Sequence, residues 1–333
     1  MPTPNPTIIG HAWAVSRIWD AIEHGRLAQS HLFVGPPSVG KRTLALATAR
    51  ELLSRSAKDR GRAAQLVDQH KHPDLFWIEA EGDGTNRSIK VETVRELLHS
   101  LSLAPVESTH RVVVICDAHL MTDSGKNALL KTLEEPNASV VLILTAPSVD
   151  QVLPTIASRC QVMTLRPASP QSIASALQQR GVEPAQAAFI ARLSRGRVGW
   201  ALRAIEDEDL LAERKERLDQ LQTLLAADYT QRLLFAEKLA RQDGPTVQAT
   251  LEEWALFWRD VVQAMHAGTA SGPNMTPLRN IDYLSLITTT AQTSHLATIT
   301  ALLRRLTQTA HFIQQNVNMR LALDVLMLNL PVA

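Results

Sequence analysis

The 333-residue sequence has little of several features that would settle its class at once. It contains only two cysteines, Cys116 and Cys160, and they lack the spacing of a disulfide framework or a metal cluster, which is typical of a reducing compartment. Aromatic residues make up 4% of the chain and the formal net charge is +1, which argues against an autonomous nucleic-acid binder. No apolar run reaches the ~18 residues of a membrane span, and the first residues lack a signal peptide's pattern. We therefore expect a soluble, cytoplasmic protein.

What the sequence does have is 45% hydrophobic residues, enough for two or three packed domains. Short apolar runs predict buried strands over 31–35, 74–79, 111–116 and 139–146. Helical periodicity predicts helices between and around these runs, over 12–28, 41–53, 91–102 and 123–135. This alternation predicts an α/β domain with a parallel sheet and flanking helices over residues 1–166.

The strand signal ends near residue 166, and helical patterns continue from there. Three short helical segments, over 170–180, 184–193 and 197–205, predict a small helical domain at 167–208. Longer amphipathic helices follow, which predict an all-α domain over 209–333. The segment GTASGPNMTP over 268–277 is predicted to be a mobile loop.

One segment, GPPSVGKRT from Gly35 to Thr43, matches a phosphate-binding loop through Lys41. Glycines such as Gly40 let backbone N–H groups curl around phosphates, and Lys41 would reach the outer ones. Arg42 stands where such loops carry the Ser or Thr that holds Mg²⁺, and a guanidinium cannot coordinate a cation. Thr43 lies one residue late, about 100° further round the helix, so its hydroxyl should point away. The loop could hold ATP or ADP without strong dependence on Mg²⁺.

A second candidate, Asp117, ends the apolar run RVVVICD, where P-loop ATPases place the carboxylate that holds magnesium through water. The next residue, Ala118, cannot act as a base toward water. Taken alone, CDAH also fits a strand end with an N-capping aspartate. Together with the loop at Gly35, it favours a nucleotide site.

Further motifs resemble those of the AAA+ subunits of bacterial sliding-clamp loaders. They are HPDLFWIE over 72–79, IKVETVREL over 89–97, NALLKTLEEP over 127–136, SRC over 158–160 and NVNMRLALDVLMLNLP over 316–331. The resemblance covers nearly the whole chain, and it implies a P-loop AAA+ module, a helical lid and an oligomerising collar. Because Arg42 and Ala118 replace functional groups of the motor subunits, the chain is most similar to the stator-type subunits of that family.

The resemblance also implies roles for individual residues. Arg159 of the SRC motif would be an arginine finger, presented in trans to a neighbouring motor subunit, although it could instead cap a helix end. Thr145 matches the position that senses the terminal phosphate. Gly199 occupies the position at which motor subunits carry a second sensing arginine. Arg197, two residues away, could partly substitute, but an exposed arginine at a helix start is the simpler interpretation.

The implied partners are the tau/gamma motor and delta subunits, the sliding clamp and primer–template DNA within the assembly, with no membrane. No independent ATPase or polymerase activity is expected, although the chain would belong to a DNA polymerase holoenzyme. Members of this family commonly carry a four-cysteine zinc module after the first helix of the loop. Residues 54–71 contain no cysteine, so no zinc is expected, and His70 and His72 should decorate a solvated turn.

Two other functions remain open on the sequence. Intact Lys41 and Asp117 are compatible with an active AAA+ ATPase, either a tau/gamma-like motor or another P-loop ATPase that remodels DNA. A DNA-binding module is disfavoured by the near-neutral charge. The tryptophans at 200, 254 and 258 are interpreted as core residues, because interleaved basic residues that would accompany base stacking are lacking.

Overall fold

The computed structural model describes residues 8–82, 87–267, 278–314 and 318–331. The loop predicted at 268–277 lies outside the described residues. The chain divides into two compact units, residues 1–203 and 204–333. None of the helices among the described residues is long and apolar enough to cross a membrane.

The first unit is built on a five-stranded parallel sheet with the strand order β2-β3-β4-β1-β5. The strands are β1 (Ser30–Val34), β2 (Leu75–Ile78), β3 (Arg111–Ile115), β4 (Val140–Ala146) and β5 (Gln161–Thr164). The three central strands are buried along their whole length, as their continuous apolar runs predict. Because β1 lies between β4 and β5, the chain leaves the sheet interior after β1 and returns at the far edge with β2.

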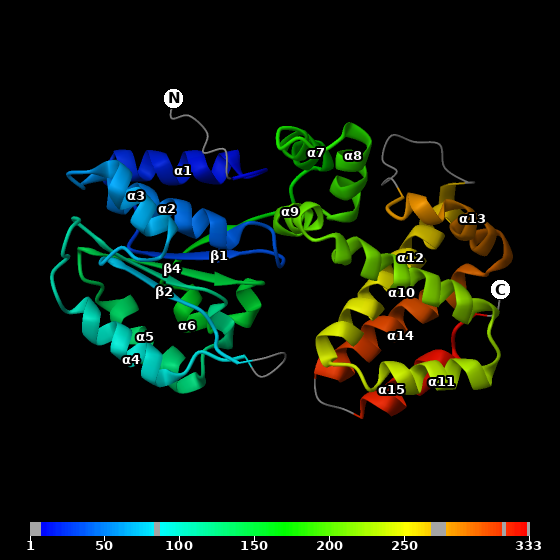
Figure 1. Cartoon of the computed structure of the whole chain (residues 1–333). Helices are drawn as coiled ribbons and strands as arrows, with labels where there is room; N and C mark the ends of the chain where they lie inside the picture. Colours follow the sequence, from blue (N-terminus) through cyan, green and yellow to red (C-terminus); the bar gives the residue numbers. More distant parts are fainter. Residues whose placement is uncertain (1–7, 83–86, 268–277, 315–317, 332–333) are drawn as a thin grey trace. The chain divides into compact units, whose positions relative to one another are not determined.

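Helices cover both faces of this sheet (Figure 1). One face carries α1 (Ala12–Glu23), α2 (Lys41–Arg55) and α3 (Arg60–Asp68), and the other carries α4 (Val91–Leu101), α5 (Asp123–Glu134) and α6 (Pro154–Ala157). Successive strand residues point to opposite faces, so Phe33 joins the first core and Leu32 the second. The predicted α/β class is confirmed.

Three short helices follow the sheet, α7 (Pro170–Gln178), α8 (Pro184–Leu193) and α9 (Val198–Glu206). Pro170 and Pro184 occupy first turns, where a missing N–H breaks no helical hydrogen bond. The side chains of Ser169 and Glu183 cap these two helices by accepting backbone N–H groups. The starts of these helices were therefore readable in the sequence.

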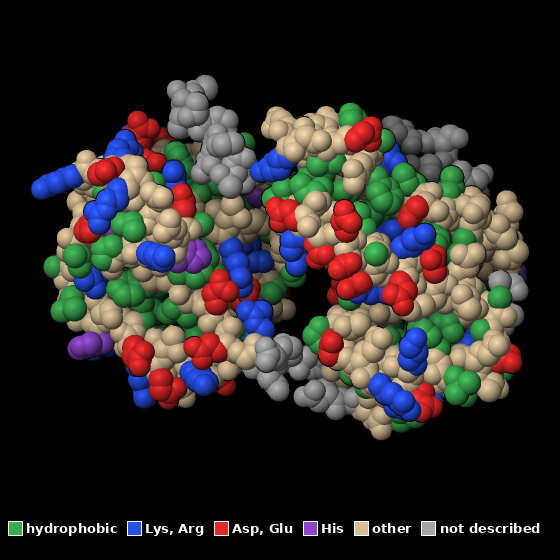
Figure 2. All heavy atoms as spheres, viewed as in Figure 1, with side chains coloured by type: hydrophobic (Ala, Val, Ile, Leu, Met, Phe, Trp, Pro, Cys, Tyr) green, Lys and Arg blue, Asp and Glu red, His purple; other side chains and the backbone are tan. Residues whose placement is uncertain are grey.

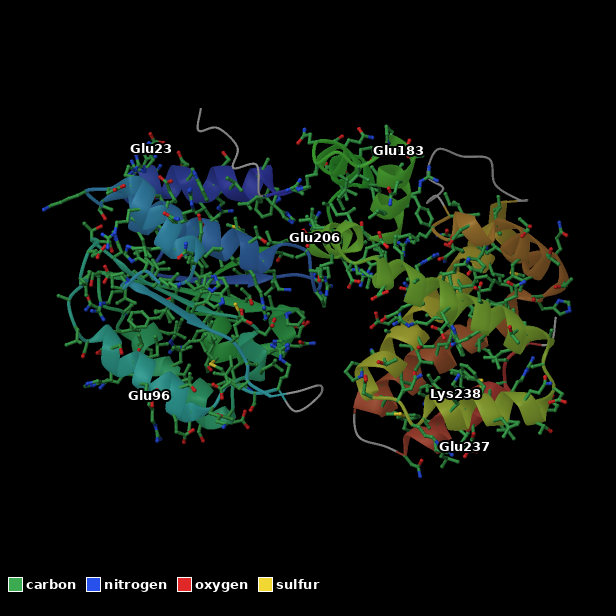
Figure 3. All side chains as sticks on the ribbon, viewed as in Figure 1. Glu23, Glu96, Glu183, Glu206, Glu237 and Lys238 are labelled. Carbon is green, nitrogen blue, oxygen red and sulfur yellow. The ribbon has the colours of Figure 1, made fainter. Side chains whose placement is uncertain are left out.

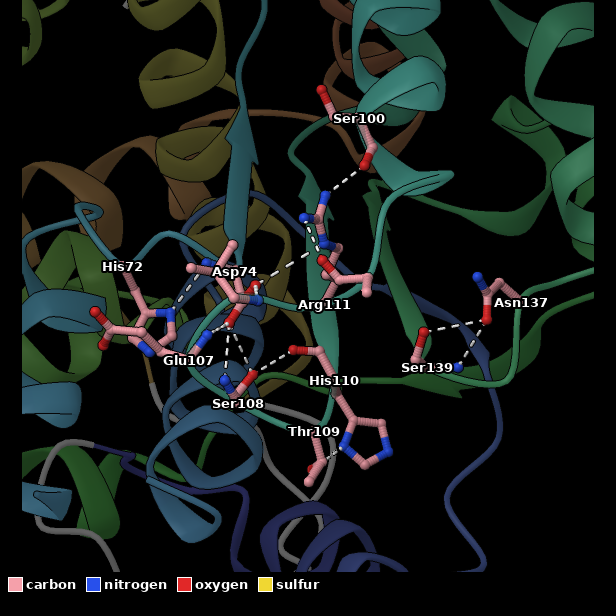
Figure 4. A network of polar contacts seen from close by, with 12 residues as sticks. His72, Asp74, Ser100, Glu107, Ser108, Thr109, His110, Arg111, Asn137 and Ser139 are labelled. Carbon is pink, nitrogen blue, oxygen red and sulfur yellow. Dashed lines mark hydrogen bonds and ion pairs between the residues drawn. The ribbon is translucent and has the colours of Figure 1, made fainter. Parts of the chain in front are cut away.

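A buried carboxylate, Asp74, holds the loop between α4 and β3 in place (Figure 4). Its Oδ1 accepts the Val106 N–H at 2.7 Å, and its Oδ2 accepts those of Glu107 and Ser108 at 2.8 and 2.9 Å. Burial alone would raise the pKa of Asp74, but these hydrogen bonds lower it. Arg111 on β3 donates to two further carbonyls of the same region. The loop is thus fixed by ionic side chains that are themselves buried.

The second unit is helical. Its helices are α10 (Glu208–Ala226), α11 (Tyr229–Leu239), α12 (Gly244–Ala267), α13 (Leu284–Thr293), α14 (Leu296–Gln314) and α15 (Met319–Leu328). Trp254 and Trp258 of α12 are fully buried in its core, and Trp200 of α9 in the first unit is also buried, as predicted. Arg232 on α11 is 1% exposed, and it donates to four backbone carbonyls at 2.7 to 3.3 Å.

Charged side chains of both signs lie interspersed on the face shown in Figure 2. Figure 3 shows Glu23 on α1 and Glu96 on α4 pointing outward from their helices. This mixture agrees with the formal net charge of +1.

Candidate functional site

The candidate site lies at the carboxyl ends of three neighbouring parallel strands, β3, β4 and β1. The segments that follow such strands meet at one edge of a sheet, where ligands of open α/β folds bind. The phosphate loop follows β1, Asp117 comes two residues after β3, and Thr145 lies at the end of β4. The buried Thr145 Oγ1 accepts the Asp117 N–H at 2.9 Å. The structure therefore brings together the nucleotide-site residues that the sequence predicted.

Glycine is required at both ends of the phosphate loop. Gly35 has φ +154°, and a Cβ there would lie 2.4 Å from the Leu165 carbonyl oxygen. Gly40 has φ +114° and stands at the N-cap of α2 without a side chain to accept N–H groups. The first N–H groups of α2 consequently have no capping side chain, an arrangement that suits an anion.

Lys41 is folded back into the loop. Its Nζ donates to the carbonyl oxygens of Gly35 at 2.6 Å and Pro36 at 3.0 Å, and the residue is 7% exposed. Burial lowers the pKa of Lys41, and the negative charge of Asp117 opposes this effect. A bound phosphate would compete with the two carbonyls for the ammonium.

Arg42 connects the start of α2 to two acidic side chains. One guanidinium nitrogen donates to Asp117 Oδ2 at 2.8 Å and the other to Glu79 Oε2 at 3.1 Å. Burial alone would lower the pKa of Arg42, but the hydrogen bond to Asp117 and the surrounding negative charge raise it. Asp117, the predicted metal carboxylate, therefore already has a cationic partner. The sequence did not single out Glu79.

The position after Asp117 carries no functional group. Ala118 begins a short 3₁₀ helix, Ala118–Leu120, and it is 1% exposed. Asp117 itself adopts a left-handed conformation with φ +56°, which aspartate tolerates better than most residues. No carboxylate follows Asp117 that could polarise water.

A cavity of about 540 Å³ opens over the loop. Among the described residues, its lining includes the cationic side chains of Lys41, Arg42, Arg87, Arg180 and Arg203 and a single carboxylate, that of Asp117. The lining also includes Thr43 and an apolar part formed by Ile8, Ile9, Val198 and Leu202. The excess of positive charge favours an anionic ligand.

The first turn of α9 contacts the loop through backbone atoms. The Gly199 N–H donates to the Ser38 carbonyl at 2.8 Å, and a Cβ on Gly199 would lie 3.3 Å from that oxygen. Arg197 is not part of the cavity lining, and its guanidinium lies 5.8 Å from the centre of the Trp200 ring. Arg203, one turn beyond Gly199, lines the cavity instead, with a guanidinium nitrogen 3.4 Å from Ser38 Oγ. Sequence spacing missed Arg203.

Arg159 lies outside this cavity. It follows α6, and its guanidinium donates to Glu134 Oε1 at the end of α5 at 2.6 Å and to the Thr155 carbonyl at 2.9 Å. The Arg159 side chain is 35% exposed and that of Glu134 is 50% exposed. An ion pair this exposed contributes little to stability, so the guanidinium can exchange partners at low cost.

About half of the chain is similar to subunits of DNA polymerase III. Residues 10–169 match the family described as DNA polymerase III, delta subunit. The DNA polymerase III subunit delta' of Bacillus subtilis is 31% identical over 181 residues, which are 53% of this chain and 54% of that protein. Subunit delta' of Escherichia coli is 33% identical over 192 residues, 56% of this chain and 57% of that protein. Through this region the chain is similar to the delta' subunits of DNA polymerase III.

A subunit of another type is about equally similar. The DNA polymerase III subunit gamma of Buchnera aphidicola is 33% identical over 167 residues, 50% of this chain and 46% of that protein. The chain spans about half the length of the curated relatives it matches. Sequence identity alone therefore does not separate the delta' type from the gamma type.

The histidines at and just after the end of the cysteine-free segment 54–71 lie in two different settings. His70 stacks on Trp77 with ring centres 4.3 Å apart. The prediction of a solvated position is wrong for His72, which is 2% exposed and accepts the Asp74 N–H through Nδ1. Within the described ranges, no three His, Cys, Asp or Glu side chains gather as a metal site.

Neither cysteine of the first unit is suited to nucleophilic chemistry. Burial raises the pKa of the Cys116 thiol to about 12 and that of the Cys160 thiol to about 11. Because the thiolate is the reactive form, both side chains are inert near neutral pH.

Proposed function

We propose that the chain is a clamp-loader subunit of the DNA polymerase III holoenzyme, a degenerate AAA+ stator. In this role it donates Arg159 to the nucleotide of a neighbouring motor subunit while a sliding clamp is loaded for DNA replication. The observation that carries the proposal is the contrast between two arginines. Arg42 neutralises Asp117 within the chain, whereas Arg159 lies outside the chain's own cavity with an exposed guanidinium.

Two other positions support a site that does not hydrolyse nucleotide. Ala118 offers no base toward water, and Gly199 meets the loop through its backbone alone. Phosphoryl transfer depends on positioned metal and cationic groups, so a loop without a metal-binding hydroxyl should be a poor catalyst.

The proposal also assigns roles to the parts of the chain. Residues 1–166 would form the AAA+ domain, 167–208 the lid, and 209–333 the collar through which subunits assemble. The proposed partners are tau/gamma motor and delta subunits, the sliding clamp and primer–template DNA, and the proposed place of action is the cytoplasm.

The test is ATP hydrolysis by an assembly in which this chain is intact and, among the motor subunits, only the adjacent one keeps its phosphate-binding lysine. Arg159→Ala in this chain should reduce hydrolysis at that site by roughly 10³-fold or more, the scale of known arginine fingers. Arg166→Ala, an exposed arginine seven residues away, is the matched control and should leave the rate unchanged. An unchanged rate with Arg159→Ala, in assemblies of normal composition, would refute the finger role.

The second candidate, an active ATPase, is favoured by the retained Lys41 and Asp117 at the cavity. Purified chain without partners decides between the two. Turnover of ATP that Lys41→Ala abolishes would establish the motor function, whereas the stator proposal expects no turnover above the variant's background.

A further inference from the structure

We propose that the cavity over the phosphate loop binds a nucleoside polyphosphate without a divalent cation, with Arg42 supplying the positive charge that Mg²⁺ supplies in related loops. The inference goes beyond the finger role, because it concerns a ligand that this chain holds in its own cavity. It stands whether or not Arg159 acts in trans.

The place of a metal is already taken by a guanidinium. Arg42 donates to Asp117 at 2.8 Å and to Glu79 at 3.1 Å, so both carboxylates nearest the loop are paired. A divalent cation beside the same carboxylates would be repelled by the positive charge of this guanidinium. A phosphate oxygen, in contrast, would be attracted by the remaining guanidinium and backbone donors.

The loop keeps the donors that bind phosphate. The N-cap of α2 is Gly40, whose left-handed conformation and missing side chain leave the first N–H groups of the helix to an incoming anion. Lys41 is bonded only to two loop carbonyls, which a phosphate can replace as acceptor. These donors recognise the phosphate chain and not the base.

Two further arginines line the cavity from the helical segment that follows the sheet. Arg180 comes after α7 and Arg203 lies on α9, and both are exposed. The contact of Arg203 with Ser38 Oγ is long at 3.4 Å, so this side chain can turn to a ligand at little cost. A polyphosphate held between the loop and Arg203 would join the sheet domain to these helices.

The apolar part of the lining argues for a nucleoside rather than a bare phosphate chain. Val198 and Leu202 lie on α9, and Ile8 and Ile9 precede α1, so apolar side chains occur next to the cationic ones. Ligand sites commonly combine such apolar surface with a few placed polar groups. Because Ala118 provides no base, the ligand would remain bound without being hydrolysed.

Calorimetric titration of the full chain with ADP and ATP, each with EDTA or with Mg²⁺, tests the proposal. The dissociation constant should agree within about threefold between the two conditions. Arg203→Ala should weaken binding about tenfold or more in both, the loss expected for one charged hydrogen bond. Arg197→Ala, on the same segment but outside the cavity lining, is the control.

A second variant tests the role of Arg42 itself. Arg42→Ser restores the metal-binding hydroxyl, so its binding of ADP should become dependent on Mg²⁺ and weaken at least about tenfold in EDTA. The wild-type chain is also titrated with inorganic triphosphate. Weaker binding of triphosphate than of ATP supports a contribution of the nucleoside to affinity. Wild-type chain that binds nucleotide only with Mg²⁺, or binds neither nucleotide nor triphosphate in EDTA, would overturn the proposal. This wild-type measurement needs no variant to fold.

Discussion

Arg42 and Arg159 belong to the same unit, yet their surroundings differ in kind. Arg42 bridges two carboxylates, Glu79 and Asp117, and among the described residues Asp117 is the one acidic side chain that lines the cavity. Arg159 has one exposed carboxylate, Glu134, and one carbonyl. The two side chains are similarly exposed, at 42% for Arg42 and 35% for Arg159, so the difference lies in their partners. A guanidinium held by two carboxylates is less free to move to an external phosphate than one held by a single carboxylate. Arginine thus occupies the metal position in the chain's own cavity at residue 42, whereas at residue 159 it is free to bind a phosphate of another chain.

The largest effect should come from replacing Arg159 by lysine, which keeps the charge and removes the planar guanidinium. In the single-motor assembly described above, Arg159→Lys should lower hydrolysis roughly 10³-fold, because a finger depends on guanidinium geometry. Arg42→Lys should leave the rate within about threefold. Equal losses for the two variants would remove the distinction between the arginines.

Acid should destabilise the sheet of the first unit, which contains both arginines, through His31 in β1. Burial lowers the pKa of His31 to about 4, against a smaller opposing effect of the Ala28 backbone. The unfolded chain therefore binds the proton first, so stability is full above about pH 6.5 and falls by about 3 kcal/mol as the pH drops to about 4.

Amide exchange of β1, corrected for intrinsic rates, measures this loss. His31→Leu should flatten the pH dependence between pH 6.5 and 4, whereas the exposed His24→Gln should not. If the stability of His31→Leu still falls between pH 6.5 and 4, the acid sensitivity belongs to other groups.

The smallest expected effect concerns the partner of Arg159. Glu134→Gln weakens the ion pair that holds the guanidinium, so hydrolysis at the adjacent motor site should rise by about two- to threefold, in line with an exposed pair of less than about 1 kcal/mol. Glu135→Gln, the exposed neighbour, should change nothing. A fall in rate with Glu134→Gln would mean that the carboxylate positions the finger rather than competing for it.

Much of the fold was predictable because the central strands are buried on both faces and appear as continuous apolar runs. Helix α1 ends at Glu23, earlier than the predicted 28, because Gly25 with φ +64° turns the chain. Helix α3 was missed, although Asp59 caps it by accepting the Arg62 N–H. Its apolar signal is short, because the helix has nine residues and buries only Ala63, Ala64 and Val67.

The site was predictable only where a motif is contiguous. Gly35 to Thr43, Asp117 and Thr145 each end or follow a strand, so the parallel sheet brings them together. Glu79 and Arg203 come from elements distant along the chain. Glu79 ends the motif HPDLFWIE, but that motif does not indicate a contact with Arg42, and nothing in the segment of Arg203 marks that residue. The same holds for Asp74, whose acceptor role depends on backbone atoms more than thirty residues away.

The most direct test of the central claim compares Arg159→Ala with Lys41→Ala in the same single-motor assembly. The account predicts that Arg159→Ala abolishes most ATP hydrolysis at the neighbouring site, whereas Lys41→Ala, which alters only this chain's own cavity, leaves it essentially unchanged. Normal hydrolysis with Arg159→Ala together with loss of activity in Lys41→Ala would contradict it, because the chain would then act as a motor and not as a finger donor.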